Sequence, residues 1–375
     1  MTPLRQLGLL LAAVIALQGA QCQEKTETFS VRKGGSLTVR TDAGDISVVG
    51  WNKEEVTVRV TGLQDSEMSF LSITRTGQSV TVEFDPPSTR SSPRFSVNVP
   101  NEFSVDLETA GGNLSIDGQL KGTLNGTTAG GDIALGSLGG TLSFRTAGGD
   151  ITTGTIDGSV TLKSAGGDLR TGPVTGAAIL STAGGDIVAG NVGKDLTAKT
   201  AGGSIAAGNI GGAVTAMTAG GEIDINAVTG NSTLKTAGGS IRVRASRGDL
   251  EAKTAGGDLE LQGIAGSVRA ETAGGDILVD LVAGSHGNSR LSSAAGDVSL
   301  HVPAGERLTI EARIRGSGGF WNEASAFAIR SDFKTDMYEK DDVKGEVRAT
   351  VTINGGGPII RVESAFGNID IKKKP

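Results

Sequence analysis

The chain has few of the residues on which most protein chemistry depends. Its 375 residues include one cysteine, two histidines and one tyrosine, and no His-Glu-x-x-His, Gly-x-Ser-x-Gly, Walker or cysteine-pair pattern occurs. A single cysteine excludes an internal disulfide, so stability must come from packing and hydrogen bonds. With so few histidines and cysteines, we expect neither a zinc site nor a Ser/His nucleophile. We therefore predict no catalytic, cofactor-binding or metal-binding residues and no cofactor.

Aromatic side chains, proline and basic charge are also scarce. The aromatics are 10 Phe, 2 Trp and 1 Tyr, so a core must be built from small aliphatic side chains. Only 9 residues are proline although 59 are glycine, which excludes both collagen and a Pro-rich disordered chain. The formal net charge is -6, and the longest basic run is Lys372-Lys373-Lys374. This charge balance excludes a nucleic-acid partner.

Residues 1–22 have the pattern of an export signal. Arg5 precedes an apolar run over residues 7–17 that is too short to span a bilayer, and small residues follow it. Cleavage after Ala20 and cleavage after Cys22 both remain open. Lipidation of Cys22 is an alternative that Gln21 disfavours, because lipoprotein signals require a small residue there. No later apolar stretch is long enough to cross a membrane, so we expect a periplasmic, envelope-associated or secreted protein without a transmembrane span.

An 18-residue repeat fills the middle of the chain. The phrase Thr-Ala-Gly-Gly-Asp-Ile, with small variations, occurs ten times; the last nine copies are spaced by 18 residues and the first precedes them by 19. The copies begin at residues 109, 128, 146, 164, 182, 200, 218, 236, 254 and 272. Apolar residues recur at module positions 6, 8, 11, 15 and 17, and the pairs 6/8 and 15/17 alternate as in strands with one buried face. Glycine at positions 3, 4, 9 and usually 13 is typical of turns.

These modules predict a parallel β-solenoid in which each module forms one coil. Helical repeats are excluded because each glycine would cost roughly 1 kcal/mol in a helix interior. Stacked coils, about 4.8 Å apart, align equivalent positions in columns. A right-handed coil is favoured because parallel crossovers prefer that hand and the apolar spacing does not repeat every six residues. The alanine at position 2 of all ten modules predicts a tight corner with room for one methyl group. Position 6 is expected to form a buried column of Leu114, Ile133, Ile151, Leu169, Ile187, Ile205, Ile223, Ile241, Leu259 and Ile277.

The two ends differ from the middle. Between residues 109 and 292 the only aromatic residue is Phe144, and the other twelve lie before or after the repeats. We expect them to cover the open ends of the solenoid rather than to form a ligand cage. Degenerate motif copies begin at Thr41, Ser293 and Ser364, which indicates irregular coils of the same solenoid. The predicted division is a signal peptide at 1–22, an N-terminal cap at 23–108, the regular solenoid at 109–292 and a C-terminal cap at 293–375. Residues 85–93 and the charged segment 334–346 are expected to be loops.

Several of these segments together resemble a known family. They are residues 28–60, with Gly44-Asp-Ile-Ser-Val-Val-Gly-Trp51, then residues 95–100, the Thr-Ala-Gly-Gly-Asp-Ile array and the closing Gly-Asn-Ile-Asp-Ile371. The chain resembles the bacterial β-strand-repeat family labelled putative adhesins over essentially its whole mature length. The resemblance implies an exported β-solenoid. It supplies no catalytic or binding residues.

The aspartates at position 5 are the first candidate site. They are Asp132, Asp150, Asp168, Asp186, Asp258 and Asp276, interrupted by Ser204, Glu222 and Ser240. A calcium column would relieve their mutual repulsion, but calcium-binding β-rolls require Gly-Gly-x-Gly-x-Asp, whereas here Asp follows Gly-Gly directly. We favour carboxylates that accept turn N–H bonds beside the cations of position 18. Those cations are Arg145, Lys163, Lys199, Lys235 and Lys253.

Three other features have structural explanations that we favour. Arg247-Gly248-Asp249 matches an integrin-type tripeptide, but Gly248 falls where glycine usually marks a turn. His286 is expected on an inserted loop and His301 on a strand. The hydroxyl residues at position 16 could form an ice-binding ladder, but interruptions favour ordinary strand surface. They are Ser143, Thr161, Thr197, Thr215 and Thr233, interrupted by Ile179, Glu251 and Arg269.

The sequence favours a non-enzymatic, adhesin-like protein or envelope scaffold. Near-identical coils offer many equivalent weak contacts rather than one differentiated pocket. The predicted partner is an envelope component, a glycan or another surface ligand, and the sequence identifies no contact residues for it. The alternative is a β-helix carbohydrate-active enzyme similar to a polysaccharide lyase. Such an enzyme would need carboxylates and a basic residue gathered where the modules diverge, before residue 109 or beyond residue 281.

Overall fold

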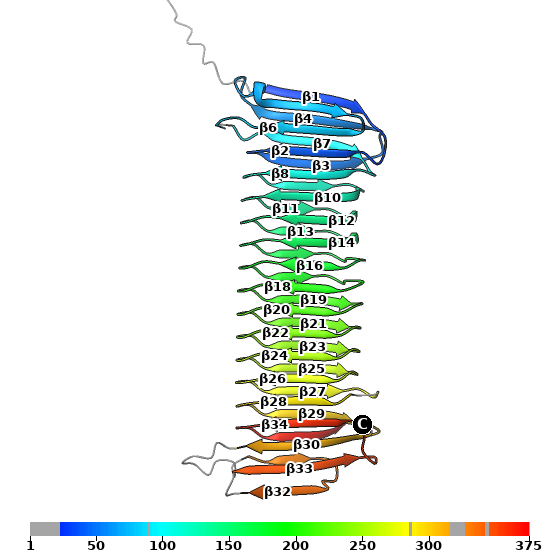
Figure 1. The fold of residues 1–375 in the computed structure, drawn as a ribbon, viewed down its shortest axis with the longest axis vertical. Helices are drawn as coiled ribbons and strands as arrows, with labels where there is room; N and C mark the ends of the chain where they lie inside the picture. The colour runs from blue at the N-terminus through cyan, green and yellow to red at the C-terminus, as the bar shows by residue number, and fades with distance from the viewer. Residues whose placement is uncertain (1–22, 89–90, 285–286, 316–326, 342–344, 375) are drawn as a thin grey trace, which may run out of the picture.

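The computed structural model describes residues 23–88, 91–284, 287–315, 327–341 and 345–374. These residues form an elongated stack of β-strands, with the N-terminal strands at one end and the C-terminal strands at the other (Figure 1). A single 3-10 turn, η1 (Met68–Phe70), is the one helical element among them. In the described part of the chain, no helix is long and apolar enough to cross a membrane. The predicted export signal, including Cys22, lies outside the described residues.

Each regular coil contributes one strand to each of two parallel sheets. The first strand of a coil follows the Thr-Ala-Gly-Gly corner, and the second begins after the glycine turns. The first strands are β9 (Leu114–Asp117), β11 (Ile133–Leu135), β13 (Ile151–Thr153), β15 (Leu169–Thr171), β17 (Ile187–Ala189), β19 (Ile205–Ile210), β21 (Ile223–Val228), β23 (Ile241–Ser246), β25 (Leu259–Ile264) and β27 (Ile277–Leu281). The second strands are β10 (Lys121–Thr128), β12 (Leu138–Arg145), β14 (Ile156–Lys163), β16 (Ala178–Ser181), β18 (Leu196–Lys199), β20 (Val214–Met217), β22 (Ser232–Lys235), β24 (Leu250–Lys253) and β26 (Val268–Thr272).

The strand register confirms that one 18-residue module is one coil. Ile133 pairs with Ile151, and Ile151 pairs with Leu169, so each residue lies beside its equivalent in the next module. All ten residues of the predicted position-6 column are at most 1% exposed. In the module that begins at residue 128, positions 8, 11, 15 and 17 are also buried. Burial of apolar area at about 25 cal/mol per Å² along this continuous core stabilises the stack.

The first coils do not stack in chain order. Strands β2 (Ser36–Thr41) and β3 (Asp45–Trp51) lie between the coil of β6 (Ser79–Phe84) and β7 (Arg94–Pro100) and the coil of β8 (Ser104–Thr109) and β9. The end is closed by antiparallel strands: β4 (Glu55–Leu63) pairs with β7, β1 (Gln23–Ser30) with β4, and β5 (Leu71–Thr76) with β6. The N-terminal strands therefore continue the solenoid and then fold back over its end (Figure 1).

The C-terminal coils are rearranged in the same way. The last strands, β34 (Ile359–Ser364) and β35 (Ile369–Lys374), lie between the coil of β28 (Ser289–Ser293) and β29 (Val298–Pro303) and the coil of β30 (Leu308–Arg315) and β31 (Ile329–Ser331). Beyond them β33 (Glu346–Ile353) pairs antiparallel with β30, and β32 (Met337–Asp341) with β33. The prediction of a loop over 334–346 was therefore wrong, because this segment contains the edge strand β32. Its exposed charged side chains are typical of an edge strand that resists pairing with other chains.

The aromatic residues at the ends have two different environments. Phe84, Phe95 and Phe103 are at most 1% exposed and fill the core of the N-terminal coils, and the ring centroids of Phe84 and Phe95 are 6.1 Å apart. Tyr338 is 52% exposed on the C-terminal edge. Trp321 and the neighbouring Phe320 lie outside the described residues.

Candidate functional site

The Thr-Ala-Gly-Gly corner is held by a hydroxyl that binds two coils at once. The hydroxyl of Thr146 donates to the carbonyl oxygen of Gly131 in the preceding coil at 2.9 Å. It also accepts the amide of Gly149 in its own coil at 3.2 Å. Threonine or serine makes the same contacts in further coils, for example Thr254 with Gly239 and Gly257. The first residue of the motif therefore has a structural role: its hydroxyl links two adjacent coils and satisfies buried backbone groups.

The prediction that the corner is tightly packed around the alanine at position 2 was wrong. It is exposed in all ten modules. The crowded position is the second glycine: a Cβ on Gly149 would overlap the carbonyl oxygen of Gly131. Only glycine allows adjacent corners to approach so closely.

The aspartates at position 5 accept turn N–H bonds, as predicted, and the donors come from the next coil. The amide of Asp150 donates to Oδ1 of Asp132 at 2.9 Å, and the amide of Asp168 donates to Oδ1 of Asp150 at 2.8 Å. The amide of Asp186 lowers the pKa of Asp168, and the Arg170 guanidinium, 2.7 Å from that carboxylate, lowers it further. Among the described residues, no three His, Cys, Asp or Glu side chains gather closely enough to hold a metal ion.

The expected pairing of these aspartates with the cations of position 18 was wrong. Within the described ranges, no ion pair joins the two columns. Lys253 instead lies 3.0 Å from Glu251 and 3.2 Å from Glu271, which belong to the same sheet face. The Thr-Ala-Gly-Gly corner separates the two columns, so position 18 and position 5 face different sides of the solenoid.

The remaining sequence candidates are also part of the architecture. Oδ1 of Asp249, in the Arg-Gly-Asp tripeptide, accepts the amide of Ser267 at 3.0 Å and its hydroxyl at 2.6 Å. These bonds lower the pKa of Asp249, the hydroxyl bond having the larger effect. A Cβ on Gly248 would overlap the carbonyl oxygen of Gly230, so this glycine serves the turn. His301 lies half-buried on β29, as predicted for a strand. His286 lies outside the described residues.

A basic face, which the sequence analysis did not identify, runs along the second strands. We define the basic face as the solvent-facing side chains at positions 16 and 18 of β12, β14, β16, β18, β20 and β22. They are Ser143, Arg145, Thr161, Lys163, Ile179, Ser181, Thr197, Lys199, Thr215, Met217, Thr233 and Lys235. The face thus carries four cations and no carboxylate, whereas the whole chain has a net charge of -6. The 18-residue period could have predicted the basic face, because it places the cations of position 18 in one column and the hydroxyl residues of position 16 in another.

A groove of about 940 Å³ borders the N-terminal end of the basic face. Its floor includes the exposed position-2 alanines Ala110, Ala129 and Ala147, beside the cations Arg145 and Lys163. The small alanine side chains lie beside long position-18 side chains, and this difference in size hollows the corner. Toward the N-terminal end the lining becomes acidic, with Asp42, Glu83, Asp85 and Glu108 around Arg40.

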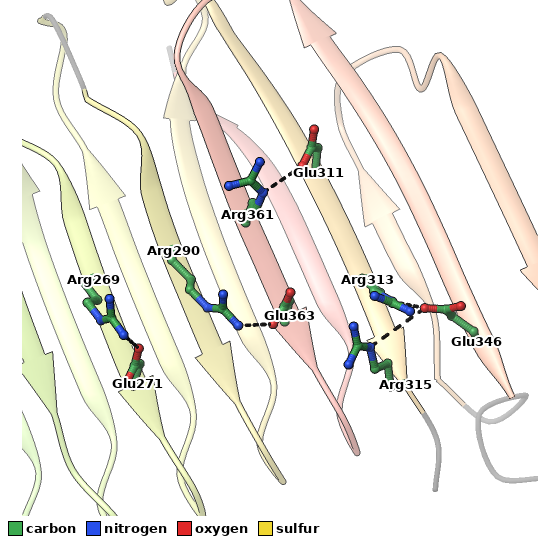
Figure 2. Close-up of polar contacts among 9 residues, drawn as sticks. All are labelled: Arg269, Glu271, Arg290, Glu311, Arg313, Arg315, Glu346, Arg361 and Glu363. Carbon is green, nitrogen blue, oxygen red and sulfur yellow. Dashed lines mark hydrogen bonds and ion pairs between the residues drawn. The ribbon is translucent and has the colours of Figure 1, made fainter. Parts of the chain in front are cut away.

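A second charged cluster lies on the same sheet where the regular modules end. Arg269, Arg290 and Arg361 are in register on adjacent strands and line a groove of about 490 Å³. Each arginine has its own carboxylate partner, as Figure 2 shows. The pairs are Arg269 with Glu271 at 2.8 Å, Arg290 with Glu363 at 2.7 Å and Arg361 with Glu311 at 3.1 Å.

Next to this column, Glu346 on β33 joins several arginines. Its side chain is only 8% exposed and contacts Arg313, Arg315 and Arg348 (Figure 2 shows the first two). Burial is the main cause of the lowered pKa of Arg313, followed by the charges of Arg315 and Arg348. One nearly buried carboxylate thus links the strands of the C-terminal fold-back.

The repeat region matches a known family model. Residues 159–320 match the family described as Toastrack DUF4097. This segment belongs to the Toastrack DUF4097 family. The Toastrack segment includes Lys163, Lys199 and Lys235 of the basic face as well as Arg269 and Arg290 of the arginine column.

Solved structures from several bacteria are similar to this chain at low identity. One is a putative adhesin from Parabacteroides distasonis, with 12% identity over 69% of this chain and 97% of the other and a TM-score of 0.35. Another is a putative adhesin from Bacteroides fragilis, with 13% identity over 94% and 97% and a TM-score of 0.22. A third, described as a putative lipid binding protein from Parabacteroides distasonis, has 11% identity over 71% and 92% and a TM-score of 0.25. No curated protein matches the sequence.

Proposed function

We propose that this protein is a non-enzymatic, exported, adhesin-like protein whose solenoid presents a repeated binding surface in the cell envelope or outside the cell. The observation that carries the proposal is the register of the second strands, which aligns chemically equivalent side chains over successive coils. A ligand with its own repeat can meet the same groups several times along such a surface. The apolar run over residues 7–17, after Arg5, supports export.

Repetition favours avidity over a single strong contact. When several weak contacts form on one rigid support, each further contact is effectively intramolecular, and overall binding can exceed the single-site affinity by roughly 10²–10⁴-fold. The coils are a suitable support because they are joined by continuous backbone ladders on both sheets. The functional unit is therefore the array rather than one coil.

A binding screen on the purified protein tests this function. The screen would present glycans and isolated envelope components, and we expect at least one to bind with an affinity that depends on coil number. A variant that lacks residues 182–235, three whole modules, is the matched control, because it keeps both ends and every column in register. Equal affinity of the two proteins for every bound component would contradict a repeated surface, and a complete absence of binding would contradict the adhesive role.

The second groove supports one alternative, a carbohydrate-active enzyme similar to a polysaccharide lyase. It combines the carboxylates of Asp249 and Glu251 with Arg269, Arg290 and Arg361 near the end of the regular modules. We favour the non-enzymatic function because Oδ1 of Asp249 is bonded to Ser267 and each of these arginines is paired with a glutamate. Incubation with acidic polysaccharides, with and without calcium, separates the two: release of unsaturated or shortened products would establish the enzyme.

A further inference from the structure

The charge of the basic face is largely unneutralised. Arg145, Lys163 and Lys199 have no ion-pair partner within the described part of the chain, and Lys235 has only Glu251, at 3.7 Å. The structure compensates other cations at short range, for example Lys253 between Glu251 and Glu271. A face that keeps its positive charge on an acidic protein attracts anions locally, although the net charge of the chain opposes them.

The spacing of these cations suits an extended chain that lies along the solenoid axis. Lys163, Lys199 and Lys235 recur every second coil, which places their strands roughly 10 Å apart. Arg145 adds a fourth charge one coil before Lys163. The four cations therefore form a line of charge over six successive strands, and a compact anion could contact only a small part of it.

The other column of the basic face supplies neutral hydrogen-bonding groups. At position 16, Thr161, Thr197 and Thr233 stand beside Lys163, Lys199 and Lys235 of the same strands, and Thr215 stands beside Met217. Each hydroxyl is both a donor and an acceptor. The face carries no aromatic side chain on which nucleobases could stack. A face that combines cations with hydroxyls, interrupted by the apolar Ile179 and Met217, matches a ligand that carries both acidic groups and sugar hydroxyls.

We propose that the basic face binds an extended acidic polysaccharide, with its carboxylate or sulfate groups on Arg145, Lys163, Lys199 and Lys235 and its hydroxyls on the threonine column. This inference rests on the proposed adhesive function and names the ligand class of the same surface. The part of the groove beside Arg145 and Lys163 extends the contact, because the polysaccharide can lie against the exposed alanines there. The carboxylates at the N-terminal end of the groove limit this contact. The acidic column at position 5 lies beyond the corner and confines the polyanion to one side.

Binding to polygalacturonate, dextran sulfate and neutral dextran tests the ligand class. We expect the purified protein to bind one or both acidic polymers at low salt, with neutral dextran at least tenfold weaker. Because the contacts are ionic, affinity should fall steeply between 50 mM and 500 mM NaCl, where the screening length shrinks to a few ångströms. The two acidic probes distinguish carboxylate from sulfate as the recognised group.

Charge-removing variants test the assigned residues. Replacing Arg145, Lys163, Lys199 and Lys235 with serine, the residue that occupies the same column at Ser181, should weaken binding at least tenfold. A second variant with glutamine at the four positions keeps the aliphatic stems, so a loss shared by both variants is due to charge. The matched control replaces four exposed cations elsewhere with serine and should bind within about twofold of the parent. These control positions are Arg32, Lys53, Lys334 and Lys372.

The outcomes separate this inference from the proposed function. Binding that is confined to neutral glycans, or that survives both four-residue variants, overturns the polyanion site and leaves the adhesive function standing. Tighter binding to anionic lipid vesicles or to single-stranded DNA than to either acidic polymer also overturns it. A homodimer that dissociates when the four cations are removed would assign the basic face to a second copy of the chain instead.

Discussion

The hydroxyl of Thr146 donates a hydrogen bond to the carbonyl oxygen of Gly131, fifteen residues earlier and one coil away, at 2.9 Å. The same hydroxyl accepts a hydrogen bond from the amide of Gly149. It therefore satisfies one backbone carbonyl and one backbone amide in a corner that contains no regular strand pairing. The same geometry recurs along the stack. It explains why the motif begins with threonine or serine, since a side chain of similar shape without the hydroxyl would leave both groups unpaired.

Thr146→Val should destabilise the protein by about 1–3 kcal/mol, because a buried carbonyl and a buried amide lose their partner while the shape is kept. Thr215→Val is the matched control: the same change on the half-exposed strand surface should alter the free energy of unfolding by less than about 0.5 kcal/mol. Urea unfolding of both variants measures the difference. Equal effects at the two sites would show that the corner hydroxyl does not support the stack.

Two adjacent glycines should respond differently to the same substitution. A Cβ at Gly131 would overlap the carbonyl oxygen of Gly112, whereas a Cβ at Gly130 meets nothing within 4 Å. We expect Gly131→Ala to lower stability by more than about 2 kcal/mol through forced backbone displacement. Gly130→Ala should be close to neutral. Thermal melts decide the matter, and a larger loss for Gly130→Ala would contradict the described corner.

Ile205 and Ile179 test which positions face the core. Ile205 is 1% exposed between Ile187 and Ile223, whereas Ile179 is 46% exposed at position 16. Ile205→Asp should therefore cost several kcal/mol, because the carboxyl group would be buried without a partner. Ile179→Asp should leave the melting temperature within a few degrees of the parent. If Ile205→Asp melts like the parent, the inner and outer faces are assigned in reverse.

Removal of whole modules should preserve the fold. Deleting residues 182–235 joins Ser181 to Thr236, so position 18 still precedes position 1 and each column meets an equivalent partner. The variant should fold and be shorter by about 14 Å, three strand spacings. Deleting only 182–226 joins half-coils out of register and should destabilise the protein. Solution scattering and thermal melts on both variants test this, and equal tolerance of the two deletions would refute it.

Acid should weaken the ladder of carboxylates. The pKa values of Asp168 and Asp249 are lowered in the folded protein by the hydrogen bonds that they accept from neighbouring coils. Because the folded pKa lies below the unfolded value of about 3.9, this stabilisation is complete above that value and is lost as the pH falls through the folded pKa. Melting temperature should be flat from pH 7 to about pH 5 and should fall below about pH 4.

Asp249→Asn isolates one carboxylate of this ladder. Asparagine keeps the acceptor for Ser267, as Asn231 does for the amide of Asp249 at 3.1 Å one coil earlier. The variant should be nearly as stable as the parent at pH 7 and should lose less stability between pH 6 and pH 3. Identical acid sensitivity of the two proteins would contradict the assignment of this carboxylate.

The candidate binding surface could be predicted only in part. The sequence placed lysines and threonines in columns, but it did not show which columns share a face. The cations of position 18 were expected beside the aspartates of position 5, and the corner places them on different sides instead. The structure places Thr197 and Lys199 on the solvent-facing side of β18, in register with their equivalents on the adjacent strands, and this shared side is the basic face.

The sequence by itself determined the regular solenoid. A period of 18 residues gives every module the same environment, so apolar residues such as Ile205 and Ile223 must share one buried column, and tandem glycines must mark the corners. The stacking of the motif copies at Thr41, Ser293 and Ser364 followed from the same pattern. The right-handed sense of the coil stays a prediction.

Only the tertiary structure decided the order of the coils at the two ends. Strands β2 and β3 lie between the coil of β6 and β7 and the coil of β8 and β9. Strands β34 and β35 lie between the coil of β28 and β29 and the coil of β30 and β31. Chain order cannot reveal this, because each degenerate coil offers the same backbone edge and a similar apolar column to either neighbour. The choice depends on packing at the open ends, where Phe84 and Phe95 fill the core and antiparallel strands such as β32 and β33 cover the last parallel edge.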